Sequence, residues 1–565
     1  MFSKKRWTYQ EAEEAEVEAL QTQLNIHPVI CKLLVHRNIN TFDKAKDFFR
    51  PNLEHLHNPF LMKDMDIAIE RIEKAITKNE RILIYGDYDV DGTTAVSLVY
   101  SYFKDISDKI VYYIPDRYTE GYGISFKGID FAEENNVTLM IALDCGIKAH
   151  DKISYAKEKG IDFIICDHHL PGDTLPEAVA ILDPKRSDCN YPFDDLSGCG
   201  IGFKLIQAYS QKNNLDAEKI YNQLDLVAVS IASDLVSVIG ENRILAKFGV
   251  DKINTNPRAG FKALMSELKL NRNLDITDLV FIIGPRINAA GRIAHGSEAV
   301  TLLIEEDYEM ALEKTKKIQQ NNTDRKTLDK DITEEAFAMI DTNEVLIHKK
   351  STVLYQEHWH KGVIGIVASR LIEKYHRPTI VLASSNGKAV GSGRSVPGFD
   401  LHDAIDACSE HLVQFGGHKY AAGLTIELDK IDDFKTAFDK VVSERITDEQ
   451  LIPQIEIDAE IELTDINEKF FNIIEQMGPF GPGNMRPVFV TKNVYDTGYS
   501  KVLNGNHLKL NILKDGQNPK NGIGFGMGDY MKIIENKETY DICFQLYANV
   551  WNGQTKIEFR LKDLR

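Results

Sequence analysis

The chain has 565 residues, 43% of them hydrophobic and 27% charged, which is an ordinary composition for a folded protein of about three or four domains. This composition excludes a disordered or fibrous chain, and because no window approaches about 18 consecutive apolar residues, it predicts a cytoplasmic protein without a membrane span. The net charge of −18 counts against a nucleic-acid partner, although a local basic groove can coexist with an acidic exterior.

The first 70 residues are predicted to form a helical cap, in which LLVHRNINTFDKAKDFF repeats apolar residues at helical spacing and ends at Pro51. Residues 71 to 306 begin with short apolar runs that alternate with helical stretches. Such alternation predicts a parallel sheet covered by helices. The predicted strands are ILIYG, KIVYYIP, TLMIAL and DFIIC, and the chain after Leu196 is predicted to be mainly helical.

Residues 307 to 345 are predicted to form a long connecting helix, because they lack Pro and Gly and place Leu328, Ile332 and Ala336 on one face. Residues 346 to 450 repeat the α/β pattern on a smaller scale. Their strands are STVLYQ and TIVLA, and the helix between them is GIVASRLIEKY. These segments therefore predict a second, smaller α/β domain.

Residues 451 to 565 are rich in predicted strands. Asn504-Gly505 and Asn552-Gly553 are flanked by alternating apolar residues, which is a strong hairpin signal. A small β-barrel of the OB type fits this length, although composition does not separate it from other small barrels. The aromatic residues of such a domain, half of them expected in its core, are candidates for stacking on bases: Phe489, Tyr495, Tyr499, Phe525, Tyr547 and Trp551.

Acidic residues and histidines follow three of the predicted strands. In open α/β sheets, ligands bind at the carboxyl ends of the strands, so these side chains are expected to meet in one crevice. Their mutual repulsion needs a counter-charge, and a carboxylate-rich set with imidazoles suits two Mn²⁺ or Mg²⁺ ions better than zinc. Asp234, an acid inside an apolar helical run, is a further candidate ligand. The strand-end residues are Asp87, Asp89, Asp91, Asp144, Asp167, His168 and His169.

Each of these residues also has a simpler interpretation. An Asp after a strand usually caps a helix, and a lone histidine is more often a structural hydrogen-bonding group than a ligand. Asp234 alone is as well explained by a structural role. The first loop, however, holds three acids where a cap needs one, so capping does not account for the whole set.

The segments GDYDVDG, LDCG and DHH together resemble the DHH phosphoesterases. IPDRYTEGYG, GPRINAAGRI, WHKGVIGIVASRL, GSGRSVPGFDLHDAI and QFGGHKYAAGLTI follow in the order and spacing of the RecJ exonucleases within that superfamily. The resemblance implies an α/β fold in which a DHH-type parallel-sheet domain is joined by the long helix to a smaller DHHA1-type domain. An OB-like β-barrel would follow.

The resemblance also implies roles for individual residues. Asp144 is the expected bridging ligand, and His169 is the expected contact to the scissile phosphate. Some superfamily members have a histidine where this chain has Tyr85, so a ligand expected there is absent. The implied metal ligands are Asp87, Asp89, Asp91, Asp144, His168 and Asp234. Arg117, Arg286, Arg292, Ser392 and Arg394 are expected to lie in loops, where guanidinium groups can bind phosphate oxygens. The implied substrate-binding residues, for which a surface salt bridge or a simple turn is the alternative, are Arg117, Arg286, Asn288, Arg292, Ser392, Arg394, Gly417 and His418.

The function implied by the resemblance is two-metal hydrolysis of single-stranded DNA from the 5′ end, which would release 5′-mononucleotides during repair and recombination. The implied partners are a RecQ-type helicase and a single-strand-binding protein, and a monomer is the default state. Two alternatives stay open. A DHH enzyme acting on short oligonucleotides or cyclic dinucleotides would not need the C-terminal domain, and a non-catalytic DNA-binding relative would have lost metal ligands.

Overall fold

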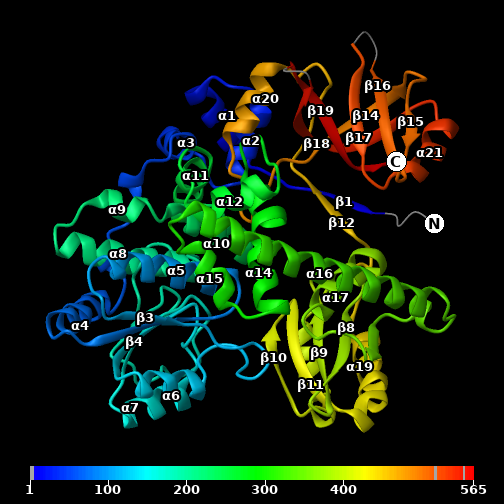
Figure 1. Ribbon diagram of the computed structural model, residues 1–565. Coiled ribbons are helices and arrows are strands. Elements are labelled where there is room, and N and C mark those ends of the chain that lie inside the picture. The colour runs from blue at the N-terminus through cyan, green and yellow to red at the C-terminus, as the bar shows by residue number, and fades with distance from the viewer. Residues whose placement is uncertain (1–4, 515–517, 552–553) are drawn as a thin grey trace. The chain divides into compact units, whose positions relative to one another are not determined.

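The computed structural model describes residues 5–514, 518–551 and 554–565, and the chain divides into two compact units (Figure 1). One unit contains Thr8–Ile318 and Glu456–Arg565, and the other contains Gln319–Ile455 with the residues up to Trp7. Each unit is described by itself. Among the described residues, no helix has both the length and the apolar character to span a membrane.

The larger unit contains the predicted parallel sheet. Alternate strand residues face opposite sides: Ile82 and Ile84 belong to one apolar cluster, and Leu83 and Tyr85 belong to another. A sheet buried on both faces explains why its strands are continuous apolar runs. The strands, in the spatial order β3-β2-β4-β5-β6, are β2 (Arg81–Gly86), β3 (Ile110–Tyr113), β4 (Val137–Leu143), β5 (Asp162–Cys166) and β6 (Ala180–Leu182).

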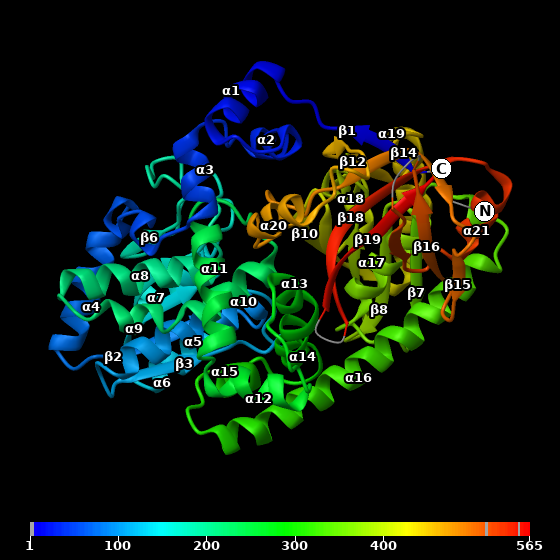
Figure 2. The same cartoon turned by 90° about the horizontal axis from the view of Figure 1, so that it is seen from above.

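Helices cover both faces of this sheet, as predicted. On one face lie α5 (Val90–Lys104) and α8 (Gly198–Lys212), and on the other lie α6 (Phe126–Glu134) and α7 (His150–Glu158) (Figure 1). Figure 2 looks down on the first layer, where α10 (Leu224–Asp234) packs beside α5. The helical stretch predicted after Leu196 is confirmed. It continues with α11 (Gly240–Thr255), α12 (Ala259–Glu267), α13 (Ile276–Asp278), the π-helix η3 (Leu279–Ile283), α14 (Gly284–Ile293) and α15 (Ser297–Leu303).

The N-terminal segment is helical, but its long periodic run is two helices. Asn38 adopts a left-handed φ of 59°, and the Thr41 side chain caps the second helix. Leu33 and Leu34 share an apolar core with Phe470 and Phe489 of the C-terminal region. The elements are β1 (Arg6–Tyr9), which pairs with β12 (Gln454–Ile457), α1 (Glu14–Leu24), α2 (Pro28–Val35), α3 (Phe42–Phe49), η1 (Leu53–His55), η2 (Pro59–Leu61) and α4 (Met65–Thr77).

The C-terminal region contains a seven-stranded sheet with α20 (Glu468–Gln476), η7 (Gly528–Tyr530) and α21 (Met531–Asn536). The strand order is β13-β14-β18-β19-β17-β16-β15, and β14 pairs with β16 as well as with β18. The extra pairing joins two strands that are far apart in this order. The hairpin predicted at Asn504-Gly505 is confirmed. Asn552-Gly553 and the Trp551 side chain lie outside the described residues, but the strands on either side pair antiparallel. The strands are β13 (Ala459–Glu460), β14 (Phe489–Asp496), β15 (Lys501–Leu503), β16 (His507–Leu513), β17 (Lys520–Gly524), β18 (Tyr540–Trp551) and β19 (Gln554–Leu564).

The smaller unit is the second α/β domain, and the predicted long helix is α16 (Tyr308–Asp341). The sheet of the smaller unit has the strand order β10-β11-β9-β8-β7. In this sheet β7 and β8 pair parallel, and the other neighbouring strands pair antiparallel. Two apolar clusters lie on its two faces. The elements are η4 (Leu346–His348), β7 (Thr352–Gln356), α17 (Ile364–Tyr375), β8 (Thr379–Ser385), β9 (Lys388–Arg394), α18 (Leu401–Asp406), η5 (Ser409–His411), β10 (Gln414–His418), β11 (Ala421–Glu427), η6 (Leu428–Lys430) and α19 (Ile431–Arg445).

Candidate metal centre

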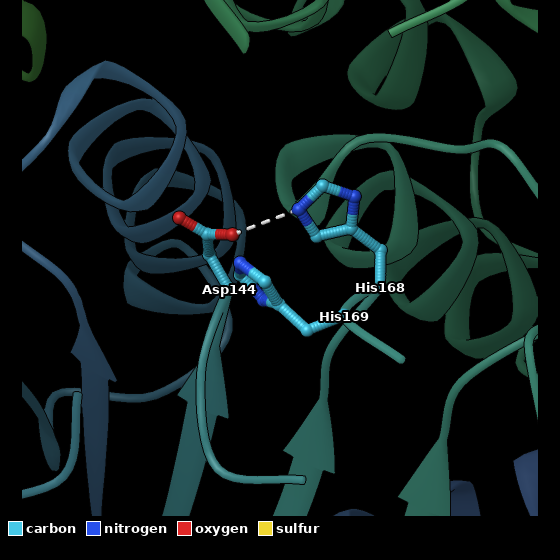
Figure 3. Close-up of side chains that lie close together, drawn as sticks. All are labelled: Asp144, His168 and His169. Atoms are coloured by element: carbon cyan, nitrogen blue, oxygen red, sulfur yellow. Dashed lines mark hydrogen bonds and ion pairs between the residues drawn. The ribbon is translucent and has the colours of Figure 1, made fainter. Parts of the chain in front are cut away.

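The carboxyl ends of the parallel strands bring the predicted acids and histidines together. Asp87 directly follows β2, Asp144 follows β4, and the Asp167-His168-His169 run follows β5. Figure 3 shows Asp144, His168 and His169 directed toward one another above these strand ends. The sequence analysis missed Asp183, which follows β6 in the same way and is fully buried. The short apolar run AIL before that Asp was the available signal.

A single imidazole nitrogen is the meeting point of three carboxylates. His168 Nε2 lies 3.1 Å from Asp144 Oδ1, 3.6 Å from Asp234 Oδ2 and 3.7 Å from Asp91 Oδ2. The His168, Asp91 and Asp144 side chains are buried, whereas the Asp234 side chain is 30% exposed. An imidazole nitrogen and carboxylate oxygens that lie this close together can act as ligands of a divalent cation.

The first turn of α8 fixes two of these acids. Asp91 accepts hydrogen bonds of 2.7 Å from the Gly198 and Cys199 backbone N–H groups, and one of 2.7 Å from Ser230 Oγ. Asp144 has a left-handed φ of 60°, and a Cβ on Gly198 would lie 2.6 Å from Asp144 Cβ. Glycine at 198 therefore allows the helix end to approach the strand end closely.

Asp87 and Asp89 occupy the loop between β2 and α5. Asp87 accepts from the Tyr88 N–H at 2.6 Å and from the Gly123 N–H at 3.1 Å. Asp89 accepts from the Gly92 N–H at 3.0 Å, so it caps α5, as the simpler interpretation of a strand-end Asp expects. The two converging groups of donor atoms found among the described residues contain Asp144 with His168 and His169, and Asp91 with His168 and Asp234. Asp87 and Asp89 stand beside these groups.

Burial and mutual repulsion raise the pKa of several of these carboxyl groups. Burial, and then the charge of Asp91, raises the pKa of Asp144 and of Asp234 well above the ordinary value. Burial, and then the charge of Asp89, does the same for Asp87. Among the described residues, neither Asp144 Oδ2 nor His168 Nδ1 has a hydrogen-bond partner. A cation would reduce the repulsion between the carboxylates and would give Asp144 Oδ2 a partner, so these residues fit a divalent metal.

Metal affinity is therefore expected to rise with pH. Asp87, Asp144 and Asp234 hold their protons to higher pH than ordinary carboxyl groups do in the metal-free protein, because their pKa values are raised, and a cation competes with those protons. A raised carboxyl pKa also means that the metal-free fold loses stability as pH rises above the unfolded value of about 3.9. We expect Mn²⁺ to bind more tightly, and to raise the melting temperature more, at pH 8 than at pH 6. Calorimetry in two buffers of different ionisation enthalpy would detect the released protons; binding without proton release would contradict this expectation.

His169 is held beside the cluster by two neighbours. Its Nδ1 lies 2.7 Å from Asp167 Oδ1, and its Nε2 lies 3.3 Å from the Tyr122 hydroxyl. Burial disfavours the charged imidazolium, but the hydrogen bond to Asp167 and the charge of that carboxylate outweigh it and raise the pKa of His169 to about 9. His169 is thus a cation at neutral pH and can donate a hydrogen bond to an anion. The sequence analysis did not identify Tyr122, which lies in the EGYG segment.

Arg117 lies in the loop before α6, as predicted, with its guanidinium 4.2 Å from the centre of the Tyr88 ring. Arg286 and Arg292 were expected in a loop, and this expectation is wrong because they lie, with Asn288, in α14. Pro285 stands in the first turn, where a missing N–H costs the helix nothing.

Helix α14 nevertheless packs against the acidic loop. A Cβ on Gly291 would lie 2.5 Å from the Tyr88 carbonyl oxygen, and the Tyr118 hydroxyl donates to the Arg292 carbonyl oxygen. Arg286 is buried and donates to the Ile282 carbonyl at 2.5 Å. Helix α14 therefore lies beside the strand-end loop at Gly291 and Arg292.

The other predicted phosphate-binding residues form a group of their own in the smaller unit. Ser392 and Arg394 lie in β9, so the loop position expected for them is wrong. Gly417 and His418 lie in strand β10. Arg394 Nη1 donates to Ser392 Oγ at 3.0 Å. β11 pairs with both strands and places Ala421 opposite Arg394 on one side and His418 on the other.

Known protein families and curated proteins match most of the chain. Family models for the DHH family N-terminal domain, the DHHA1 domain and the RecJ OB domain match residues 81–231, 348–444 and 457–563. The single-stranded-DNA-specific exonuclease RecJ of Bacillus subtilis is 35% identical over 99% of this chain and 71% of its own length. The Haemophilus influenzae protein of that name is 32% identical over 95% of this chain and 93% of its own.

Solved structures agree with these matches. The crystal structure of RecJ from Thermus thermophilus in complex with Mn²⁺ superposes with a TM-score of 0.86 at 25% identity, over 100% of this chain and 80% of that one. A crystal structure of an exonuclease RecJ bound to manganese has a TM-score of 0.61 at 28% identity, over 70% of this chain and 98% of that one.

Proposed function

This chain belongs to the RecJ family of single-stranded-DNA-specific exonucleases, and we propose that it removes nucleotides from the 5′ end of single-stranded DNA and releases 5′-mononucleotides. It is a metal-dependent nuclease that hydrolyses phosphodiester bonds. The observation that carries the proposed site is the convergence of Asp91, Asp144 and Asp234 on His168 Nε2. A non-catalytic relative would have lost metal ligands, so the presence of these three carboxylates and the imidazole counts against that alternative.

We assign the metal ligands to the acids and the histidine at the strand ends. Bound Mn²⁺ or Mg²⁺ would supply charge neutralisation at the phosphate and an activated water. His169 would donate from Nε2 to a non-bridging oxygen of the scissile phosphate, while Asp167 holds its Nδ1. The proposed ligands are Asp87, Asp89, Asp91, Asp144, His168 and Asp234, with Asp144 shared between two ions.

The direction of degradation is the first part of this proposal to test. A strand labelled at its 5′ or its 3′ terminus would be incubated with the full chain and Mn²⁺ or Mg²⁺, with blunt duplex and RNA as controls. Immediate release of the 5′ label as mononucleotide, with the 3′ label kept in progressively shorter strands, is the expected result. Release of the 3′ label first would overturn the polarity, and cleavage confined to di- or trinucleotides would favour the small-substrate alternative.

Arg394 and Ser392 of the smaller unit are proposed to bind the terminal 5′-phosphate. Burial lowers the pKa of Arg394, and a buried guanidinium beside a hydroxyl is suited to an anionic ligand. Replacing Arg394 by Ala is expected to reduce the preference for 5′-phosphorylated over 5′-hydroxyl strands by about tenfold or more, because a charge-assisted contact is lost. Arg445→Ala, which removes an ion pair with Asp403 in the same unit, is the matched control. An unchanged preference in Arg394→Ala would exclude this pocket.

The C-terminal region brings together aromatic rings and guanidinium groups that we propose as the strand-binding face. The Arg560 guanidinium lies 3.6 Å from the Tyr547 ring centre and 5.7 Å from that of Phe525. The Arg486 guanidinium lies 4.4 Å from Tyr547 and 4.3 Å from Phe480. Phe525 is 57% exposed. Exposed rings beside cations suit stacked bases and their phosphates.

Loss of this face is expected to weaken strand binding. In a catalytically inactive background, Arg560→Ala and Phe525→Ala should each weaken binding of an oligothymidylate by about tenfold, and the Arg560 change should reduce the salt dependence of binding. Fluorescence anisotropy at two salt concentrations measures both effects. Phe42→Ala, which removes an equally exposed ring from α3, should leave binding unchanged. Equal binding by all three variants would show that the strand-binding face lies elsewhere.

We also propose a role in DNA repair and recombination with a RecQ-type helicase and a single-strand-binding protein, with the chain acting in the cytoplasm as a monomer. The family supports this part of the proposal. Sedimentation of the purified chain would test the oligomeric state, and stimulation of nuclease activity by each purified partner would test the association.

A further inference from the structure

The loop that follows Asp234 begins with one exposed residue, Leu235, before Val236 returns to the apolar core. Asp234 is the last residue of α10, and Leu235 ends the helix with a left-handed φ of 58° while its side chain is 59% exposed. A non-glycine residue in this conformation needs support from its surroundings. The position of the Asp234 carboxylate therefore depends on what holds the next few residues.

A segment from the C-terminal region, residues 477–485, holds this loop at Val238. The Val238 N–H donates to the Pro482 carbonyl at 2.7 Å, and the Val238 side chain is 1% exposed. A Cβ on Gly481 would lie 2.4 Å from Val238 Cγ2, so any side chain there would push the loop away. The contact is thus both a hydrogen bond and a close approach that only glycine allows.

The 477–485 segment is itself rigidly fixed around Asn484, which is fully buried. The Asn484 side-chain amide donates to the Met477 and Pro479 carbonyls, both at 2.8 Å, and its oxygen accepts from Arg37 Nε at 2.8 Å. The buried Arg243 guanidinium donates to the Met477 carbonyl at 2.8 Å and to the Gly478 carbonyl at 2.9 Å. A segment with its carbonyl groups satisfied in this way can act as a fixed support.

The opposite side of the loop is held by Asp195 and Asn242. The Ser237 N–H donates to Asp195 Oδ2 at 2.9 Å, and the Asn242 amide donates to the Ser237 carbonyl at 2.9 Å and to the Asp195 carbonyl at 2.6 Å. The residues between Asp234 and α11 are therefore clamped from two sides. One of the two sides belongs to a part of the chain more than two hundred positions away in sequence.

We infer that residues 477–485 position Asp234 for metal binding, so that the C-terminal region contributes to the metal centre without supplying a ligand. This inference rests on the proposed role of Asp234 as a ligand. The same segment contains Phe480, and Arg486 directly follows it; both residues belong to the strand-binding face proposed above. Groups that orient metal ligands typically change metal affinity by about 10- to 100-fold when they are altered.

The test is Mn²⁺ affinity of the full chain, measured by calorimetric titration after chelation. Gly481→Ala should weaken Mn²⁺ binding by about tenfold. The double variant Gly481→Ala with Val238→Ala, which removes the overlapping Cγ2 atom, should recover most of that loss. Val494→Ala, which makes a cavity in the buried core of the C-terminal sheet, should lower the melting temperature and leave the Mn²⁺ affinity unchanged.

Asp234→Ala separates the two ways in which the inference could fail. If Asp234→Ala binds Mn²⁺ as the parent chain does, the proposed ligand set is wrong. If Asp234→Ala weakens binding but Gly481→Ala does not, or if Val238→Ala gives no recovery, the positioning role is wrong. If Gly481→Ala does not melt cooperatively, Asn484→Ala tests the same segment without an overlap, and an unchanged Mn²⁺ affinity in that variant would equally overturn the inference.

Discussion

Replacing Asp144 by Asn is expected to lower the rate of single-stranded DNA hydrolysis by about 10³-fold or more. Asp144 lies closest of the three carboxylates to His168 Nε2, at 3.1 Å, and its second oxygen has no partner among the described residues. Asparagine keeps the shape of the side chain but removes the charge that a cation needs. The loss should therefore appear in metal binding as well as in hydrolysis.

The same substitution should not destabilise the metal-free fold. Burial and the charge of Asp91 raise the pKa of Asp144, so the folded metal-free protein already favours its uncharged form. We expect an equal or higher melting temperature without metal, and a smaller increase when Mn²⁺ is added. Asp173→Asn, in an exposed loop after His169, is the matched control. A variant that keeps more than about a tenth of the parent activity would show that Asp144 is not a ligand.

The clustering of acids and histidines at the strand ends was predictable because the topology of the sheet imposes it. In a parallel sheet every strand ends at the same edge, so acids that directly follow ILIYG, TLMIAL and DFIIC must be neighbours, whatever the details of the loops. The apolar runs were long enough to identify as strands, and the long helix contained no Pro or Gly to interrupt it. The fold class and the strand-end cluster therefore followed from local patterns.

Contacts between distant segments were not predictable in this way. Tyr122 contacts His169 across 47 positions, and the Gly198 N–H reaches Asp91 across 107. Ser392 and Arg394 in GSGR were expected in a loop, but the segment is strand β9. A Cβ on Gly391 would lie 2.6 Å from a Leu382 methyl group, which shows that close packing between strands, not a turn, requires glycine there. Sequence alone does not distinguish these two uses of glycine.

Replacing His169 by Ala is expected to lower the turnover number by about 10²- to 10³-fold while leaving Mn²⁺ affinity within about threefold of the parent value. The reason is that His169 contributes a hydrogen-bond donor toward the phosphate, whereas His168 contributes the nitrogen on which the carboxylates converge. Single-turnover hydrolysis and calorimetry measure the two quantities separately. A large loss of Mn²⁺ affinity would instead make His169 a ligand, and an unchanged turnover would leave it without a catalytic role.

The pH profile gives a second test of the same role. Because Asp167 raises the pKa of His169 to about 9, the imidazolium is present at neutral pH and is lost as the pH rises through that value. The charges of Asp234 and Asp89 also raise this pKa, and bound Mg²⁺ would offset them, so the value of about 9 is an upper bound for the metal-bound chain. Single-turnover rates with Mg²⁺ should therefore fall at alkaline pH in the parent chain, and His169→Ala should show no such fall. Asp167→Asn weakens the support of the ring and should move the decline to lower pH. Tyr122→Phe removes the 3.3 Å hydroxyl contact but not the Asp167 contact, so its decline should stay at the pH of the parent chain; a decline unchanged in Asp167→Asn would mean that another group titrates there.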